Sequence, residues 1–395
     1  MTWYAAAFSG ALLALLHLPA VADEVAAAPK VDEPSGEAPA LPPVAAKVAV
    51  TASPVVEEVR RDPLAGAVTT VGARQLEDLH AGDPAAALRR VPGLVVSRYN
   101  LVGSYGGGDG GGVFVRALGS GRPGAELSFA VDGVAKAAGV WSHPLLDAIP
   151  LDAAESLEVY KGAQPVLFGN AAFATVDVST KRRTEEGFGG RATAAFGRFA
   201  TSALSAEVSG REGPFDLLVV AGQRRSDGHR EASDGRTRAF FARAGWELGG
   251  GWALSLAGDV TSGRASDPGA EGGPPRGATP VWDSDDAMGV LTLTRRHGTK
   301  EGFLKVWVED GAIDWLQWDG GRKEAFRTFT DWRGAGLKAR DGFLLPGGVE
   351  LTVGLDVESV RGVSREARAE GDVPLGDHRF RNVAPYAALA RTFGG

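Results

Sequence analysis

The sequence contains no cysteine and only two methionines. Without cysteine the chain has no disulfide bonds, no thiolate nucleophile and no metal site built on thiolates. The six histidines are scattered singly, without the spacing of a metal-ligand pair, so we expect no metal site and no cofactor. A formal net charge of −7 leaves no basic surface for nucleic acid, and no nucleic-acid partner is expected.

Catalytic motifs are also missing. The chain has neither a G-x-S-x-G nucleophile elbow nor an H-E-x-x-H metalloprotease motif. Its acidic residues are spread through turns, as solubility alone would place them. We therefore expect no catalytic residue and no enzymatic activity.

Apolar runs long enough to approach a membrane span occur only at the N-terminus. Residues 5–16 are apolar, and Ala20-Val21-Ala22 forms a small-x-small cleavage site, which predicts an export signal over residues 1–22. The run is preceded by no Lys or Arg, so a buried helix or a membrane anchor is the alternative. A spanning helix needs about 20 apolar residues, which favours the cleavable signal.

Glycine is abundant, with 56 of 395 residues, and this favours a mainly β architecture because glycine inside helices costs about 1 kcal/mol each. Residues 23–46 are rich in Ala and Pro without periodicity, which predicts a flexible segment. A small α/β region is expected over 55–186. In it Asp83 and Pro84 begin a short helix that Pro92-Gly93 ends, and strands are expected at 94–99, 113–118, 126–134, 156–162 and 175–182.

Residues 187–395 alternate polar and apolar side chains in segments of about ten residues, separated by both short turns and long loops such as 263–284. This pattern is typical of an antiparallel transmembrane β-barrel. A soluble β-sandwich or adhesin is the alternative. Strands are expected at 191–200, 202–210, 215–225, 238–248, 252–263, 288–297, 302–310, 349–360 and 383–393.

The stretch "GGGDGGGVF", residues 106–114, matches the G-x-G-x-x-G pattern of phosphate-binding loops. Such a loop must open a helix, whose N-terminus holds the phosphate, but here a strand-like "VFVRAL" follows. A nucleotide-using periplasmic enzyme is therefore the weakest of the functional hypotheses.

Several segments around this loop resemble the TonB-dependent outer-membrane receptors in the order expected for that family. "ALRRVPGLVV", "VFVRALG", "FAVDGV" and "IPLDAAESLEVYKGAQPVLFGNAAFATVDVSTKR" resemble its plug-domain motifs. The resemblance implies a plug domain inside a 22-strand barrel that imports scarce nutrients such as metal chelates. The positions that match the plug motifs are Pro92, Gly93, Arg116, Asp132, Gly133, Glu158, Lys161, Gly162 and Gly169.

The resemblance also implies a group of plug cations that pair with carboxylates of the barrel. Arg116 and Lys161 stand at those positions, although the family has arginine where this chain has Lys161, and lysine lacks the bidentate fork. The alternative is that both are solvated strand-end charges. Asp132-Gly133 is most simply a turn.

A short strand-forming island at residues 47–54 resembles the TonB box of the family, the segment that the TonB C-terminal domain binds. Its residues Val48, Ala49, Val50, Thr51 and Ala52 can add to the edge of a partner's sheet through main-chain hydrogen bonds. The alternative is an ordinary first strand of the plug.

Plug loops that point outward contact the ligand in this family, and the matching loops here are 98–112 and 135–143. The side chains able to stack on or bond to a chelate are Tyr99, Tyr105, Asp109, Trp141 and His143. The expected ligand is a ferric siderophore or a similar small-molecule metal chelate.

Residues 187–395 provide about ten strands, whereas a plug of this size requires about 22. We therefore expect a partial barrel from a truncated or divided receptor, in the Gram-negative outer membrane. Its expected partners are outer-membrane lipid, the chelate, and TonB with its inner-membrane energising complex. The main alternative is a passive pore or surface adhesin with an unrelated N-terminal domain.

Overall fold

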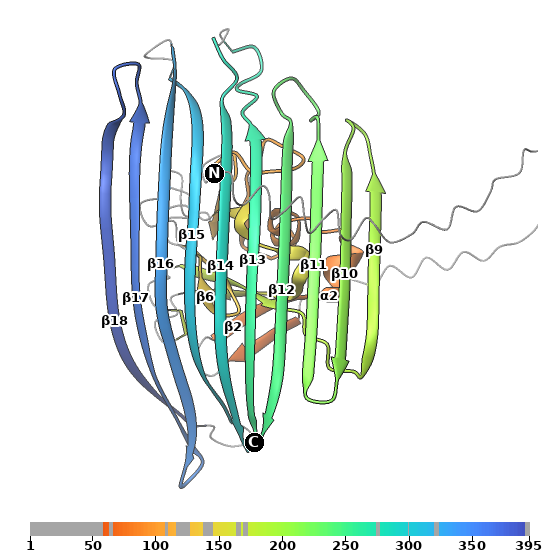
Figure 1. The fold of residues 1–395 in the computed structure, drawn as a ribbon, viewed down its shortest axis with the longest axis vertical. Helices are drawn as coiled ribbons and strands as arrows, with labels where there is room; N and C mark the ends of the chain where they lie inside the picture. The colour runs from red at the N-terminus through yellow and green to blue at the C-terminus, as the bar shows by residue number, and fades with distance from the viewer. Residues whose placement is uncertain are drawn as a thin grey trace, which may run out of the picture. The chain divides into compact units, whose positions relative to one another are not determined.

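The computed structural model describes residues 58–62, 66–106, 110–115, 127–136, 145–162, 167–168, 173–273, 277–298, 300–319 and 324–391. By its internal contacts the chain divides into Met1–Val56 and Glu57–Gly395, and all described residues lie in the second unit. This unit contains an N-terminal α/β region and a ten-stranded antiparallel sheet, which we call the wall (Figure 1). The predicted mainly β fold, a small α/β region followed by antiparallel strands, is confirmed.

The α/β region is built on a six-stranded sheet in the order β1-β2-β7-β8-β5-β6. Its strands are β1 (Glu58–Asp62), β2 (Gly66–Gly72), β5 (Leu127–Val131), β6 (Val134–Ala135), β7 (Ala154–Lys161) and β8 (Ala174–Thr180). Strands β5 and β8 are parallel, and the other pairs are antiparallel. A separate hairpin joins β3 (Leu94–Val96) to β4 (Val113–Val115).

Short helices connect these strands. Helix α3 (Pro84–Leu88) begins as its sequence predicts, because the Asp83 side chain accepts a hydrogen bond from the Ala86 amide at 2.9 Å and Pro84 occupies the first turn. Helix α2 (Ala73–Asp78) lacks a side-chain cap. Two 3₁₀ turns, η1 (Leu146–Ala148) and η2 (Leu151–Ala153), lead into β7.

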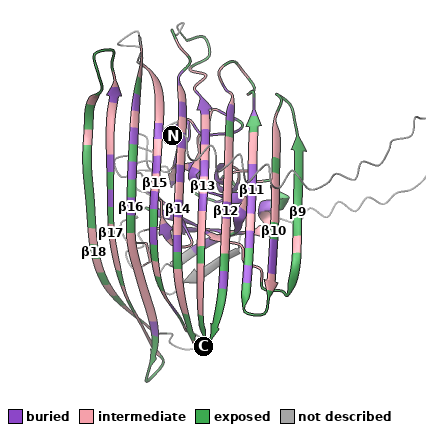
Figure 2. Cartoon of the chain, in the orientation of Figure 1, coloured by how far each residue is buried: buried purple, intermediate pink, exposed green. Residues whose placement is uncertain are grey.

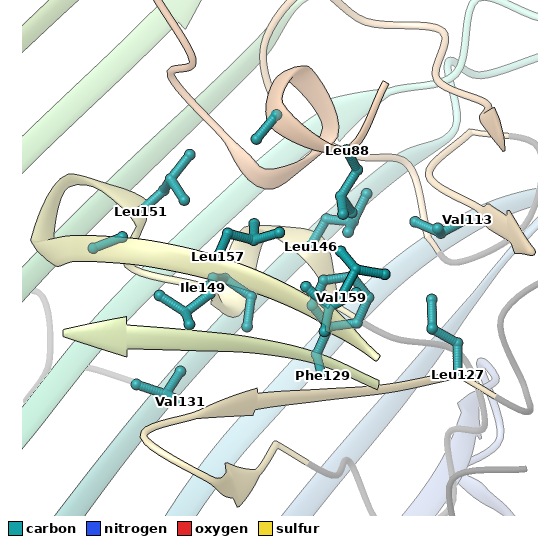
Figure 3. Packing of buried hydrophobic residues seen from close by; sticks show 14 of the residues in the cluster. Leu88, Val113, Leu127, Phe129, Val131, Leu146, Ile149, Leu151, Leu157 and Val159 are labelled. Carbon is teal, nitrogen blue, oxygen red and sulfur yellow. The ribbon is translucent and has the colours of Figure 1, made fainter. Parts of the chain in front are cut away.

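The core of the α/β region lies between α3, η1, η2 and the six-stranded sheet. Figure 3 shows apolar side chains from these elements pointing toward one another, among them Leu88, Phe129, Leu157 and Val159. Leu88, Leu157 and Val159 have no exposed surface. The region therefore has a hydrophobic core of its own.

The wall is a meander in which every strand pairs with its neighbour in sequence. Its strands are β9 (Gly187–Phe196), β10 (Ser202–Glu212), β11 (Phe215–Ser226), β12 (Gly235–Gly249), β13 (Trp252–Ser266), β14 (Val281–His297), β15 (Lys300–Asp319), β16 (Glu324–Leu345), β17 (Val349–Ala367) and β18 (Val373–Arg391). Strands β12 to β18 have 15 or more residues and are longer than the predicted ten. Strand β16 has no counterpart among the predicted segments.

Connections between wall strands differ at the two ends. At one end they have two or three residues, as at 213–214 and 250–251, and we call this the short-connection end. At the other they are longer, as at 227–234 and 267–280, and we call this the long-connection end. The two ends of the wall are thus distinguishable.

Side chains of the wall strands alternate between an inward face, which contacts the α/β region, and an outward face. On β14, Trp282, Asp286, Met288 and Val290 are buried inward, and the residues between them are more exposed. Figure 2 shows this banding on the central strands. Within the described ranges, no helix is long and apolar enough to cross a membrane.

Candidate functional site

The most deeply buried ionic contact between the α/β region and the wall is made by Lys136, the residue after β6. Its ammonium donates hydrogen bonds to Asp259 on β13, at 2.5 Å, and to Asp286 on β14. The three side chains are 5%, 1% and 2% exposed, respectively. An uncompensated charge at this depth is strongly unfavourable, so the three groups depend on one another.

Buried carboxylates outnumber the single ammonium group around Lys136. Glu309 on β15 is buried close by and adds a third carboxylate. Burial alone lowers the pKa of Lys136, but the attraction of Asp259, Asp286 and Glu309 outweighs it and raises the pKa above its ordinary value. Lys136 is therefore charged at neutral pH, and the carboxylates hold it.

A second ionic contact joins η2 to β11. Arg224 binds the Asp152 carboxylate with both terminal nitrogens, at 2.8 and 2.7 Å. Space for this carboxylate comes from Gly222, where an added Cβ would lie 2.1 Å from the Asp152 oxygen. The bidentate geometry fixes the orientation of η2 as well as its position.

The predicted turn at Asp132-Gly133 is observed between β5 and β6, with both residues at positive φ. The Asp132 carboxylate accepts hydrogen bonds from the Thr180 amide at 2.9 Å and hydroxyl at 2.7 Å, which fixes the turn to the end of β8. Its carbonyl accepts a hydrogen bond from Lys305 on β15 of the wall. The turn is therefore also a contact with the wall.

Asp177 on β8 supports the same turn, because its carboxylate accepts a hydrogen bond from the Gly133 amide at 2.9 Å. Burial raises the pKa of Asp177 to about 6, although the Gly133 hydrogen bond opposes the shift. The group is therefore partly protonated in mildly acidic solution.

Further polar contacts extend the interface toward the first wall strands. Arg191 on β9 pairs with Glu77, and Lys181 pairs with Glu207 on β10 at 2.7 Å. Together with Asp152, Lys136 and Asp132, these contacts are distributed over β9, β10, β11, β13, β14 and β15. The α/β region is thus held against the inward face of the wall at many separate points.

Toward the long-connection end, an aromatic cluster joins the glycine-rich loop to the wall. The Tyr105 oxygen accepts a hydrogen bond from Trp315 Nε1 at 2.8 Å, and the two rings meet edge-on with centroids 6.1 Å apart. Trp282 and Trp332 are buried in the same cluster. One of the predicted ligand-contacting side chains, Tyr105, therefore lies among indole rings of the wall.

The glycines of this loop permit close backbone approach. The Tyr105 amide donates to the Gly110 carbonyl at 3.1 Å, closing the loop. An added Cβ at Gly111 would lie 2.2 Å from the Gly106 carbonyl oxygen, so no larger residue fits there. The described part of the loop leads into strand β4 and opens no helix, as the sequence predicts.

Below the aromatic cluster, Asp147 of η1 accepts a hydrogen bond from the Ser104 amide at 2.9 Å. Burial raises the pKa of Asp147 to about 7, against the Ser104 hydrogen bond. The carboxylate faces Gly263 on β13, where an added Cβ would lie 2.5 Å away. Asn100 completes this side by donating to the carbonyls of Asp234 and Ser266 at 2.9 and 2.8 Å.

A cavity of about 860 Å³ lies between the α/β region and the wall. The Asp132-Gly133 turn, Tyr160 and Asp177 line one side. Lys305, Lys338 and Arg340 are among the basic residues on the other. Its volume falls in the range of small-molecule sites.

The remaining predicted plug positions that the structure describes lie on turns or on and directly after strand β7. Gly93 follows exposed Pro92 at φ 79°, and Gly162 ends β7 at φ 127°. Glu158 accepts a hydrogen bond from the Tyr160 hydroxyl at 2.6 Å, while Lys161 and Tyr99 are half-buried. Outside the described residues lie the signal (1–22), the flexible segment (23–46), the TonB box (48–52), Asp109, Arg116, Trp141, His143 and Gly169.

No group of three or more His, Asp or Glu side chains within the described ranges is placed to hold a metal ion. The described residues of the site provide ion pairs, hydrogen bonds and aromatic contacts.

Comparison with known families identifies the α/β region. Residues 61–176 match the family described as TonB-dependent Receptor Plug Domain. These residues form a plug domain of the TonB-dependent receptor type. The alternative of an unrelated N-terminal domain is thereby excluded, and no curated protein matches the sequence significantly.

Solved TonB-dependent receptors share the fold of plug and wall. Pseudomonas aeruginosa FpvA bound to a ferric pyoverdine matches with a TM-score of 0.65 at 14% identity, covering 85% of this chain and 50% of FpvA. The copper transporter OprC matches with 0.64 at 16% identity, covering 84% and 52%. The ferric yersiniabactin uptake receptor FyuA of Yersinia pestis matches with 0.63 at 13%, covering 82% and 60%. The chain thus spans half or slightly more of the length of these receptors.

Sequence reasoning missed the most buried plug–wall contacts, those of Lys136 and Asp152. Lys136 lies outside the plug motifs, Asp152 lies in one but was not singled out, and their partners are 123 and 72 residues away in sequence. A signal was nevertheless present, because Gly222 and Gly263 interrupt wall strands at inward positions and leave room for Asp152 and Asp147.

Proposed function

We propose that the chain acts in TonB-driven uptake of a metal chelate across the outer membrane of a Gram-negative bacterium. The single observation that carries this proposal is how the plug is held, by separate polar contacts to six strands of the wall. Ionic contacts can be broken and remade, and most of the hydrophobic core of the plug is formed by the plug itself. The domain is therefore fixed in place yet releasable, and no covalent chemistry is required.

The ligand site in this proposal lies at the long-connection end, around Tyr105. Tyr105, Trp282 and Trp315 provide an aromatic surface with a phenol and indole dipoles, suited to a chelate with flat, conjugated groups. Tyr99, Asp109, Trp141 and His143 complete the proposed contacts. The matched receptors support an iron or copper chelate, since FpvA binds ferric pyoverdine, FyuA takes up ferric yersiniabactin and OprC is a copper transporter.

Energy transfer is assigned to the TonB box, residues 48–52. A short β-branched strand can pair with a sheet edge of the TonB C-terminal domain through main-chain hydrogen bonds alone. Pro92, Gly93, Arg116, Asp132, Gly133, Glu158, Lys161, Gly162 and Gly169 are proposed to shape and fix the plug. Export by residues 1–22 precedes both steps.

Ligand binding is tested by tryptophan fluorescence of the purified chain in detergent. Ferric pyoverdine, ferric yersiniabactin and a copper chelate are titrated separately. We expect one of them to quench the fluorescence saturably, and Tyr105→Ala with Trp315→Phe to weaken that binding at least tenfold. The control is Trp252→Phe, which changes a tryptophan at the opposite end of the wall.

Two results would contradict the ligand site. One is saturable binding that the Tyr105 and Trp315 substitutions leave unchanged, and the other is absence of binding by every chelate. TonB coupling is tested separately with a peptide spanning residues 47–54 and the isolated TonB C-terminal domain. A Thr51→Pro peptide is the control, because proline cannot donate to the added strand.

A further inference from the structure

The outward face of the wall carries an apolar belt bordered by arginines. On β12 the outward residues from the short-connection end are Trp246, Ala244, Ala242 and Phe240, followed by Arg238 and Arg236. On β18 they are Leu389, Ala387, Pro385 and Val383, followed by Arg381 and Arg379. The same change from apolar to basic thus occurs on strands at opposite sides of the wall.

These arginines form two rows that run across neighbouring strands. Arg225, Arg236 and Arg264 are direct cross-strand partners on β11, β12 and β13. Arg333, Arg361 and Arg379 are direct partners on β16, β17 and β18. We call these residues, with Arg238 and Arg381, the arginine girdle.

Direct opposition of like charges destabilises a sheet, so the two rows require compensation. Carboxylates provide part of it: Arg264 pairs with Asp283 at 2.7 Å, and Arg361 binds Asp377 at 2.9 and 2.6 Å. Arg225 and Arg333 likewise pair with Asp227 and Asp310.

Among the described residues, four members of the girdle have no acidic partner. Arg236, Arg238, Arg379 and Arg381 make no ion pair with any carboxylate in the described part of the chain. Arg238 Nε is moreover buried without a hydrogen-bond partner there. Positive charge on this face is therefore only partly neutralised by the protein.

The height of the girdle places it at a membrane boundary. On three strands an exposed apolar residue near the short-connection end is ten residues away from a girdle arginine on the same strand. The pairs are Phe215 and Arg225 on β11, Trp246 and Arg236 on β12, and Leu389 and Arg379 on β18. Ten residues of strand extend about 34 Å, which corresponds to roughly 26 Å along the membrane normal at a tilt near 40°. The apolar band of an outer-membrane barrel is about 25 Å tall, so the arginines lie at the headgroup layer above it.

We propose that the arginine girdle binds the phosphate groups of phosphorylated lipids in the outer leaflet. Guanidinium groups match phosphate geometry with two parallel hydrogen bonds, whereas the adjoining apolar belt takes the acyl chains. Four arginines without an acidic partner supply the charge complementarity. The inference goes beyond chelate uptake and rests only on the outer-membrane location included in the proposed function.

The test compares two double variants of the full chain in detergent by native mass spectrometry with bis-phosphorylated lipid A. Arg236→Gln with Arg238→Gln removes two girdle cations and leaves no carboxylate stranded. The control, Arg198→Gln with Arg295→Gln, removes two exposed arginines outside the girdle. Each cation near an anionic lipid surface strengthens attraction about fivefold, so the girdle variant should bind lipid A at least about tenfold more weakly.

Two further arms identify the lipid phosphate as the group that is bound. Dephosphorylated lipid A should bind the wild-type chain as weakly as lipid A binds the girdle variant, and inorganic phosphate should not displace lipid A. Equal binding by girdle and control variants, undiminished binding of dephosphorylated lipid A, or displacement by inorganic phosphate would each overturn the proposal. Arg238→Gln alone replaces the double variant if the latter does not fold.

Chelate titration on the same samples separates this proposal from the proposed function. The girdle variant should retain its tryptophan quenching by the chelate, because its substitutions lie on the outward face. Loss of lipid A binding with intact quenching supports the girdle, and absence of quenching in the wild type affects the uptake proposal alone.

Discussion

Replacing Lys136 with methionine should weaken the attachment of the plug to the wall more than any other single removal of charge. Methionine retains most of the apolar stem but leaves Asp259 and Asp286 buried without their cation, beside the buried Glu309. Removing one partner of a buried ion pair costs about 3–5 kcal/mol, because the remaining charge is neither paired nor hydrated. We expect this range, since both partner aspartates are at most 2% exposed.

The absence of cysteine provides a direct assay. Ala130 in β5 is fully buried, so Ala130→Cys gives the chain a single thiol that reacts only when the plug opens. A loss of 3–5 kcal/mol corresponds to a rise of about a hundred- to a few-thousand-fold in the labelling rate under conditions where opening is rapid and reversible. The rate is measured with a thiol reagent on chains with Lys136 and with Lys136→Met.

Two comparisons make the result specific. Adding Asp259→Asn and Asp286→Asn to Lys136→Met should restore most of the protection, because neutral amides tolerate burial better than unpaired carboxylates. Arg333→Gln should change the rate less than about fivefold, because its pair with Asp310 is on the outward face and Arg333 is 86% exposed. If Lys136→Met labels at the rate of the parent, or if the asparagines do not restore protection, the reasoning is wrong.

Three other predictions concern single groups of the interface. Burial raises the folded-state pKa of Asp147 to about 7, so the stability that this group contributes is complete below its ordinary pKa near 4 and is lost as the pH rises to 7. Asp147→Asn should abolish this pH-dependent loss of stability, which is at most about 4 kcal/mol and is measured by urea unfolding between pH 4 and 8. Gly111→Ala should destabilise the loop by about 1–3 kcal/mol, because its Cβ would collide with the Gly106 carbonyl. The comparison in thermal unfolding is Gly298→Ala, where an added Cβ meets open space and only the positive φ is unfavourable. Arg224→Lys should expose η2 to protease, because lysine cannot bind both oxygens of Asp152, whereas unchanged cleavage would show that charge alone is sufficient.

Local signals in the sequence predicted the elements whose stability is local. The Asp83-Pro84 start of α3 was predictable because an N-cap and an N1 proline act within one turn. Helix α2 was missed because Gly72 stands at its N-cap and no side chain caps it. Strand β16 was missed because charged and small residues interrupt its apolar alternation, and it is held by its pairing with β15 and β17.

The contacts of the site were less predictable because they depend on register between distant segments. The sequence indicates that Lys136 follows a strand, but only the sheet topology brings it between Asp259 and Asp286, on strands more than 100 residues later. Tyr105 was predictable as a candidate from its place in the glycine-rich loop. Its partner Trp315 was not, since the two are 210 residues apart.

The composition of the plug–wall interface explains how attachment and release can coexist. Among the described residues, the wall adds Met288, Val290, Trp307 and Val360 to the hydrophobic cluster of the plug, and two smaller apolar clusters join Tyr105 and Ala153 to the wall. Apolar contact is non-directional, so these clusters contribute adhesion without fixing position. Position is fixed by the polar contacts, which are directional and are most deeply buried at Lys136 and Asp152. Separating plug from wall would therefore break many charged contacts and remove these few wall side chains, but would leave most of the plug core in place, as the proposed function requires.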